Sequence, residues 1–292
     1  MTTTSSADSV QARLRADVLV EALPYIRRFT GKRVVVKLGG NAMSDPELAL
    51  QFAADVVLMR SVGIQPVVVH GGGPQIGELM TRLGKEPEFR DGLRVTDAET
   101  LDIARMVLGG RVNREIVSAI NAHDRLGVGL SGEDAGLLIA TQRDAALGYV
   151  GQVQAVNPDV LETLLGAGFI PVVSTLAGDG SGQAYNVNAD AAAIAIAAAV
   201  GAEKLVYLTD VPGVLEEVDD PTSLLSHLSA ARAQTLIAAG VIAGGMIPKL
   251  EACLDAVALH VQSSHILDGR IPHVLLLELF TDAGVGTMIT RQ

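Results

Sequence analysis

The chain has 292 residues, of which 49% are hydrophobic and only 3% aromatic, and its formal net charge is -11. This length predicts one large domain or two smaller ones, with a core built from Ala, Val, Leu and Ile. The negative charge argues against a nucleic-acid partner, which needs a basic patch, and against an anionic membrane surface.

The single cysteine, Cys253, lies in a helical pattern and is expected in the core. It excludes an internal disulfide and a structural zinc site, which indicates a reducing, cytoplasmic setting. The N-terminus has no apolar stretch after a charged start, so no signal peptide is expected. The most apolar run, residues 191–200, is too short to span a bilayer. We therefore expect no membrane partner.

Residues 1–31 precede the first apolar strand and predict an N-terminal helix. Val10, Leu14 and Val18 follow roughly helical spacing. Pro24 is expected to kink or split this helix. An amphipathic helix cannot bury its apolar stripe alone, so it must pack on the body or on another subunit.

From residue 32 onward, apolar strands alternate with helical patterns. The predicted strands are Arg33–Leu38, Gln65–His70, Gly127–Leu130, Phe169–Val173, Lys204–Leu208 and Val261–Leu267. The expected helix starts are Asp45 before Pro46, Thr96 in a capping box with Glu99, Asn157 before Pro158, and Asn188 before Asp190. Apolar strands joined through helices pair in parallel, with helices on both faces. We therefore expect a three-layer αβα sandwich with a mainly parallel central sheet. The stretch Glu88–Val95 and the pair "LLIATQ" and "YVGQVQAV" predict inserted hairpins.

Glycines are concentrated at the predicted strand ends, where ligands bind in parallel sheets. In "HGGGPQ", Gly71–Gly73 follow a buried strand and precede a helix. Their N–H groups could hold anionic oxygens. A tight strand–helix turn is the alternative, but three consecutive glycines exceed what a turn requires.

Two lysines are candidates for phosphate contact. Lys37 ends the first strand in "KLGGNA", and Lys249 follows "GG" in the first turn of a helix. A cation is unfavourable near a helix N-terminus unless an anion is present. The alternative is that both lysines reach solvent as ordinary surface residues.

Three further polar residues stand beside these motifs. Asp190 suits the first turn of its helix without any function, because it complements the helix dipole. Asn186 could donate to a carboxylate, and Arg94 in "GLRVT" could clamp one in a bidentate fork, unless it is a surface arginine. The sequence contains no GxSxG, CxxC or HExxH motif, so we predict no protein-held metal site.

Six motifs occur in order between Lys32 and Leu250: "KLGGNA", "VVVHGGGPQI", "GLRVT", "NVNADAAA", "LTDVPGV" and "GGMIPKL". Together they resemble the amino-acid kinase family, and within it the kinases of N-acetyl-L-glutamate. The resemblance implies transfer of the γ-phosphoryl group of ATP, carried with Mg²⁺, to the side-chain carboxylate in arginine biosynthesis. A carboxylate is already ionised, so this reaction needs no general base. It needs groups that stabilise charge on the phosphoryl oxygens.

The resemblance also implies residue roles. It divides residues 32–292 into an N-lobe of about 32–175 that binds the acylated amino acid and a C-lobe of about 176–292 that binds the nucleotide. Lys37 and Lys249 would contact the transferring phosphoryl group, with Asp190 positioning both. The implied amino-acid site consists of Gly72, Gly73, Arg94 and Asn186, and the implied nucleotide site consists of Gly39, Gly40, Thr209, Asp210 and Met246.

Some relatives of this type are inhibited by L-arginine and form hexamers, as trimers of dimers interlaced by N-terminal helices. The similarity implies an arginine site here, made by Tyr25, Lys204, His265, Glu278 and Gly284. Alternatively, these are ordinary surface residues and the helix is a solubility arm.

Three other functions compete with this interpretation. A kinase of the same fold could act on aspartate, carbamate or a carrier-bound aminoadipate. A non-catalytic amino-acid sensor would be expected to lack Lys37 or Lys249, and both are present. A Rossmann dehydrogenase would carry GxGxxG after its first strand, which "KLGGNA" does not supply.

Overall fold

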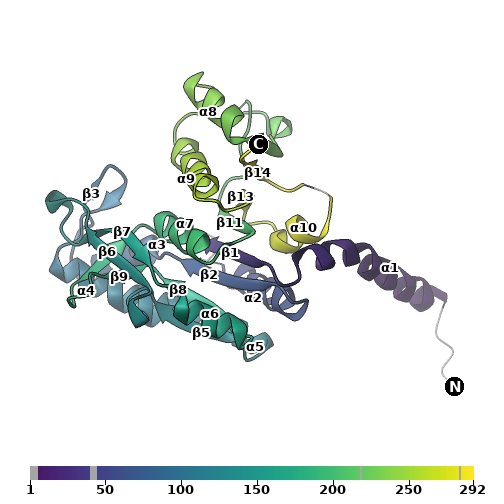
Figure 1. Cartoon of the computed structure of the whole chain (residues 1–292), viewed down its shortest axis with the longest axis horizontal. Coiled ribbons are helices and arrows are strands. Elements are labelled where there is room, and N and C mark those ends of the chain that lie inside the picture. The colour runs from purple at the N-terminus through teal and green to yellow at the C-terminus, as the bar shows by residue number, and fades with distance from the viewer. Residues whose placement is uncertain (1–5, 40–44, 218, 283) are drawn as a thin grey trace.

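The computed structural model describes residues 6–39, 45–217, 219–282 and 284–292. Within these residues, one eight-stranded sheet runs through the centre of the molecule, between helices on both faces (Figure 1). In spatial order its strands are β12 (His227–Ser229), β14 (Thr287–Thr290), β13 (Ser263–Asp268), β11 (Lys204–Thr209), β1 (Arg33–Leu38), β2 (Gln65–His70), β8 (Ile170–Ser174) and β5 (Gly127–Ser131). Neighbours are parallel except for β13 and β14, which are antiparallel. The predicted α/β fold with a mainly parallel sheet is confirmed.

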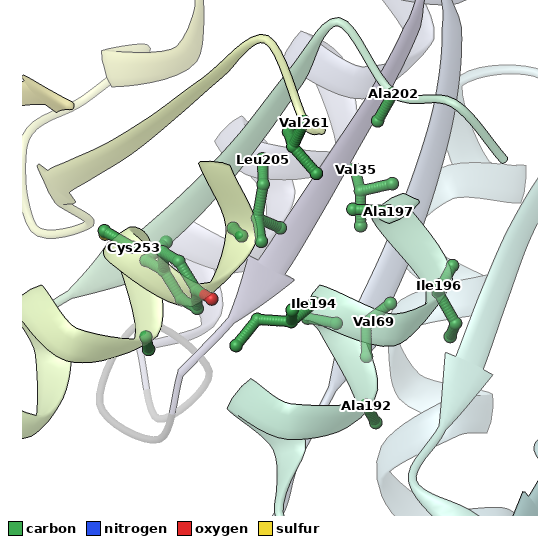
Figure 2. Packing of buried hydrophobic residues seen from close by; sticks show 14 of the residues in the cluster. Val35, Val69, Ala192, Ile194, Ile196, Ala197, Ala202, Leu205, Cys253 and Val261 are labelled. Atoms are coloured by element: carbon green, nitrogen blue, oxygen red, sulfur yellow. The ribbon is translucent and has the colours of Figure 1, made fainter. Parts of the chain in front are cut away.

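The sheet is buried on both faces because successive side chains of each strand point to opposite sides. Val34 and Val36 of β1 belong to one apolar cluster, and Val35 belongs to the other. Figure 2 shows the second cluster, in which Val35 and Leu205 of the sheet lie beside Ala197 and its helix. Each fully buried Val stabilises the fold by about 1.5–3 kcal/mol. Cys253 is also buried in this cluster, as predicted.

The helices form the two outer layers. The cluster of Val34 and Val36 is covered by α2 (Pro46–Ser61), α3 (Gly73–Arg82), α4 (Ala98–Arg105), the π-helix η2 (Met106–Val112), α5 (Asn113–His123) and α10 (Val274–Phe280). The cluster of Val35 is covered by α6 (Asp159–Gly166), α7 (Ala189–Ala199), α8 (Ala230–Ala238) and α9 (Met246–Ala258). Short 3-10 turns are η3 (Asp134–Gly136), η4 (Ala145–Leu147) and η5 (Pro221–Ser223).

The N-terminal helix α1 (Ser6–Phe29) projects from the body (Figure 1). It continues through Pro24, so Pro24 does not split the helix, and the expected kink stays a prediction. Its last residue, Phe29, is only 2% exposed, whereas Leu14 and Val18 are exposed. The C-terminal end of α1 is therefore anchored in the core, while its apolar stripe has no partner among the described residues.

Smaller strands stand beside the main sheet. The strands β10 (Ala184–Val187), β7 (Val150–Val156), β6 (Leu138–Gln142) and β9 (Leu176–Gly178) close a small barrel. The antiparallel pair of β6 and β7 confirms one predicted hairpin. The pair β3 (Phe89–Arg90) and β4 (Leu93–Arg94) confirms the other.

Two of the four predicted helix starts are confirmed, because Asp45 and Asn188 cap α2 and α7 with their side chains. The Thr96 capping box was wrong. Asp97 caps α4 instead, accepting from the Thr100 N–H at 2.8 Å, because the Thr96 hydroxyl donates to the carbonyl of Arg94. Asn157 lies one residue too early, since Pro158 occupies the cap position of α6.

Candidate active site

Parallel strand order brings the glycine motifs to one edge of the sheet. Lys37 on β1 is paired with Tyr207 on β11 and with Val69 on β2, so these three strands end side by side. The N-termini of α3 and α7 lie at the same edge, because α3 begins at Gly73 and Gly71 lies against Ala189. This edge is where ligands bind in open α/β sheets.

One cavity at this edge, which we call the lysine pocket, has a volume of about 320 Å³. It is lined by Lys37, Gly39, Asp190, Leu208, Thr209, Asp210, Pro248 and Lys249. Lys37 Nζ lies 2.9 Å from Asp190 Oδ1, and only 15% of the Lys37 side chain is exposed. Lys249 forms no ion pair with any described residue, so the expected contact with Asp190 stays a prediction.

The glycine at position 39 is required sterically. A Cβ there would lie 2.7 Å from the carbonyl oxygen of Leu208, which is backbone and cannot move aside. Gly40 lies outside the described residues. Met246 opens α9 three residues before Lys249, but it packs on the apolar core and does not line the pocket.

A second cavity, the glycine-loop pocket, has a volume of about 180 Å³. All four residues predicted for the amino-acid site line it: Gly72, Gly73, Arg94 and Asn186. Arg94 donates from Nη2 to the carbonyl of Gly73 at 2.8 Å and stacks over the ring of Phe89 at 4.8 Å. Burial lowers the pKa of the guanidinium, which stays charged because its ordinary value is so high.

The two pockets adjoin at the start of α7. A Cβ on Gly71 would contact the Cβ of Ala189 at 3.3 Å, and Ala189 lines the glycine-loop pocket. The next residue, Asp190, lines the lysine pocket. Two anionic ligands in the two pockets would therefore meet at the positive end of this helix dipole.

Some residues of the glycine-loop pocket were missed by the sequence analysis. Phe89 and Leu108 line it, but apolar side chains carry no chemical signature. Leu108 lies in η2, where Gly109 and Gly110 interrupt the helical pattern. π-helical segments often occur at functional sites, so the glycine pair was the available signal.

A larger cavity of about 880 Å³ lies between α2, α3 and α5 and contains none of the predicted site residues. No group of three or more His, Cys, Asp or Glu among the described residues could hold a metal ion. No helix in that same part of the chain is both long and apolar enough to cross a membrane.

Three of the five residues predicted for an arginine site form a buried cluster. Lys204 Nζ donates to Glu278 Oε1 at 2.9 Å, and His265 Nδ1 lies 2.9 Å from the same oxygen. Burial acts to raise the pKa of Glu278, but its contacts with His265 and Lys204 outweigh burial and hold it below the usual value. Tyr25 instead interacts with Asp282, and Gly284 is exposed.

Comparisons with known proteins cover the part of the chain that lines the two pockets. Residues 32–268 match the model of the amino acid kinase family. The acetylglutamate kinase of Synechococcus sp. (strain RCC307) is 54% identical over 277 residues, which cover 94% of this chain and 94% of that protein.

A solved structure is also similar. The N-acetylglutamate synthase of Neisseria gonorrhoeae, complexed with coenzyme A and N-acetyl-glutamate, has a TM-score of 0.84 at 29% identity and matches 95% of this chain. This chain spans only 63% of that synthase chain. The same synthase complexed with coenzyme A and L-arginine has a TM-score of 0.79 at 28% identity, with 95% of this chain and 65% of that chain covered. The family match, residues 32–268, includes every residue that lines the lysine pocket and the glycine-loop pocket.

Proposed function

This chain belongs to the amino acid kinase family, and we infer that it transfers the γ-phosphoryl group of ATP to the side-chain carboxylate of N-acetyl-L-glutamate. The reaction gives an acyl phosphate and belongs to arginine biosynthesis. The inference rests on one observation above all, the similarity to acetylglutamate kinase along 94% of both chains. The two adjoining pockets supply a place for each reactant.

We propose that N-acetyl-L-glutamate lies in the glycine-loop pocket. It carries one carboxylate that does not react, and Arg94 can grip it. Of its five guanidinium N–H groups, the described contacts to Gly73 and Met80 use only part. Asn186, whose Nδ2 lies 3.3 Å from the hydroxyl of Thr96, supports the same pocket from β10. The N–H groups of Gly72 and Gly73 are suited to anionic oxygens.

The triphosphate of ATP would lie in the lysine pocket, beside Thr209 and Asp210. Two anions repel, so the main task of the site is to neutralise charge as they approach. Lys37 on β1 and Lys249 on α9 are far apart in the sequence, and both place a positive charge at this pocket. The ion pair with Asp190 keeps the Lys37 ammonium fixed before substrate arrives, which lowers the reorganisation needed during the reaction.

We propose that Mg²⁺ enters bound to the phosphate oxygens of ATP. The lysine pocket offers the carboxylates of Asp190 and Asp210, hard oxygen donors of the type that Mg²⁺ prefers. They would contact the hydrated ion, and the ion would add positive charge at the phosphates. A cytoplasmic location is also a proposal, supported by the free thiol of Cys253.

Regulation by L-arginine and a hexameric assembly are proposals as well. The Lys204–His265–Glu278 cluster offers buried charges that could recognise the charged ends of an amino acid. The exposed Leu14 and Val18 of α1 offer an apolar stripe for a neighbouring subunit. A structural neighbour solved with L-arginine supports testing this ligand first.

The function is tested by incubating the protein with ATP and N-acetyl-L-glutamate and trapping the acyl phosphate with hydroxylamine. Aspartate and carbamate serve as competing substrates, and ADP release is measured in parallel. We expect hydroxamate only with N-acetyl-L-glutamate. Turnover of another carboxylate with none of N-acetyl-L-glutamate would favour the alternative kinase, and ATP-independent ligand binding without turnover would favour a sensor.

A further inference from the structure

A buried histidine lies directly beneath the glycine loop and takes no part in the mechanism described above. His70 is the last residue of β2 and is 0% exposed. Its Nδ1 lies 2.9 Å from the carbonyl oxygen of Gly71, and its Nε2 lies 3.1 Å from Nδ2 of Asn113. Both ring nitrogens are therefore engaged.

The position of Asn113 fixes which ring nitrogen of His70 carries the proton. Asn113 is 1% exposed, and its amide nitrogen also donates to the carbonyl of Val172 at 2.8 Å, while its Oδ1 accepts from Arg114. An amide nitrogen can only donate, so Nε2 of His70 must accept. The proton then resides on Nδ1 and is donated to Gly71. Burial lowers the pKa of His70 to about 4, which keeps the ring neutral at physiological pH.

Holding the carbonyl of Gly71 determines the direction of the next N–H group. The Gly71 C=O and the Gly72 N–H belong to one planar trans peptide and point in opposite directions. The carbonyl is turned toward the buried ring of His70, so the Gly72 N–H is turned away from that ring. Among the described residues no atom accepts from this N–H.

The neighbouring helix adds a steric constraint. A Cβ on Gly72 would lie 2.7 Å from Cδ2 of Leu108 in η2, so the loop is tightly packed as well as hydrogen-bonded. The π-helical segment ends at Val112, and Asn113 follows immediately as the first residue of α5. The π-helical segment therefore supplies the side chain that packs on Gly72 and directly precedes Asn113, which contacts His70.

We propose that His70, held by Asn113, is a positioning residue that aims the Gly72 N–H into the glycine-loop pocket, where it donates to an anionic oxygen of the reacting groups. His70 touches neither substrate; it acts through the Gly71–Gly72 peptide. This role rests on the kinase function inferred above.

The test compares two replacements of His70. His70→Phe keeps the ring shape but removes both nitrogens, whereas His70→Asn retains an N–H donor near the place of Nδ1. We expect His70→Phe to lower kcat roughly 10- to 100-fold with little change in the KM for ATP, because a misdirected oxyanion donor costs transition-state stabilisation. His70→Asn should recover at least tenfold of a 100-fold loss.

Val173→Ala is the matched control for stability. Val173 is equally buried on the adjacent strand β8, so its truncation should lower the thermal midpoint without lowering kcat of the folded enzyme. If His70→Phe loses activity only as its folded fraction falls, or if the Phe and Asn variants are equally active, the proposal is overturned.

A crystal structure of His70→Phe supplies a readout independent of activity. We expect a turned or doubly oriented Gly71–Gly72 peptide, and an unchanged peptide would overturn the positioning role. Should the wild-type protein fail to phosphorylate N-acetyl-L-glutamate, the kinase function would be wrong. The comparison of peptide orientation would still decide what His70 does.

Discussion

The carboxylate of Asp55 and the imidazole of His273 lie 2.6 Å apart, between Oδ1 and Nδ1. They join α2, the helix after the first strand, to the start of α10, the helix that carries Glu278. Asp55 is only 3% exposed, and burial raises its pKa to about 6, although the contact with His273 opposes this rise. His273 adopts a left-handed φ of 55° where it leads into α10.

This pair predicts a stability that declines as pH rises from about 4 to about 6. The folded chain binds the Asp55 proton more tightly than the unfolded chain does, so raising the pH through this window favours unfolding. A pKa of about 6 against 3.8 corresponds to about 3 kcal/mol. Asp55→Asn should therefore gain up to about that amount over wild type at pH 7, and nothing at pH 4, in urea unfolding.

Asp97→Asn is a control, because the pKa of Asp97 is shifted in the opposite direction to that of Asp55. The hydrogen bond with Lys85 has the largest effect and, together with contacts to Thr100, lowers the pKa of Asp97 to about 2. Its contribution to stability is present above pH 4 and is lost as the pH falls toward 2. The Asn variant should lose stability at neutral pH. Parallel pH curves for wild type and Asp55→Asn would contradict the role given to Asp55.

We predict that a positive charge alone is not enough for catalysis at Lys37 and Lys249 of the lysine pocket. Lys37→Arg and Lys249→Arg should each lower kcat by on the order of 10²-fold, with a small change in the KM for ATP. A planar guanidinium cannot place its charge where the compact ammonium does. Steady-state kinetics with both substrates provide the measurement.

Lys32→Arg is the control for these variants. Lys32 forms a surface ion pair with Glu203 at 3.3 Å and lines neither pocket, so its replacement should leave kcat unchanged. A near-normal kcat in both Lys37→Arg and Lys249→Arg would show that the proposed contact of these lysines with the transferring phosphoryl group is wrong.

Arg94→Ala is expected to act on substrate binding. The guanidinium should grip the carboxylate that does not react, and this contact is similar in the ground and transition states. We therefore expect the KM for N-acetyl-L-glutamate to rise about 10- to 100-fold while kcat changes little. Arg90→Ala, on the same hairpin and paired with Glu88 at the surface, should change neither constant. A collapse of kcat at constant KM would instead place Arg94 in the chemical step.

Deletion of residues 1–28 tests the proposed arginine regulation. Phe29 is retained because it is buried in the core, whereas the exposed stripe of α1 is removed. We expect the intact protein to be a hexamer that arginine inhibits cooperatively, and the shortened protein to be an active dimer that responds weakly. Light scattering and activity against arginine concentration measure both properties. A shortened protein that remains hexameric and fully inhibited would refute this mechanism.

Much of the fold could be predicted because local patterns and tertiary packing agree. Apolar runs such as Val34–Val36, buried here on both faces, are typical of a parallel sheet covered by helices, and their alternation with helical patterns indicates the fold class. The strand β14 was missed, since Thr287–Thr290 has only four residues and its sequence TMIT shows neither an apolar run nor the alternation typical of a strand. The capping error at Thr96 has another origin, because two adjacent residues could both serve as a cap and the Thr96 hydroxyl donates to the carbonyl of Arg94 instead.

The sequence by itself determined which residue types stand at the strand ends, and hence Lys37, the glycine loops, Arg94, Asn186 and Lys249 as site candidates. Only the tertiary structure decided that they divide into two adjoining pockets, that Asp190 pairs with Lys37, and that His70 and Asn113 meet beneath Gly71. The physical reason is distance along the chain. A glycine or a lysine at a strand end is a local feature, whereas residues 43 or more positions apart meet only through the order of strands in the sheet and the register of the helices packed on it.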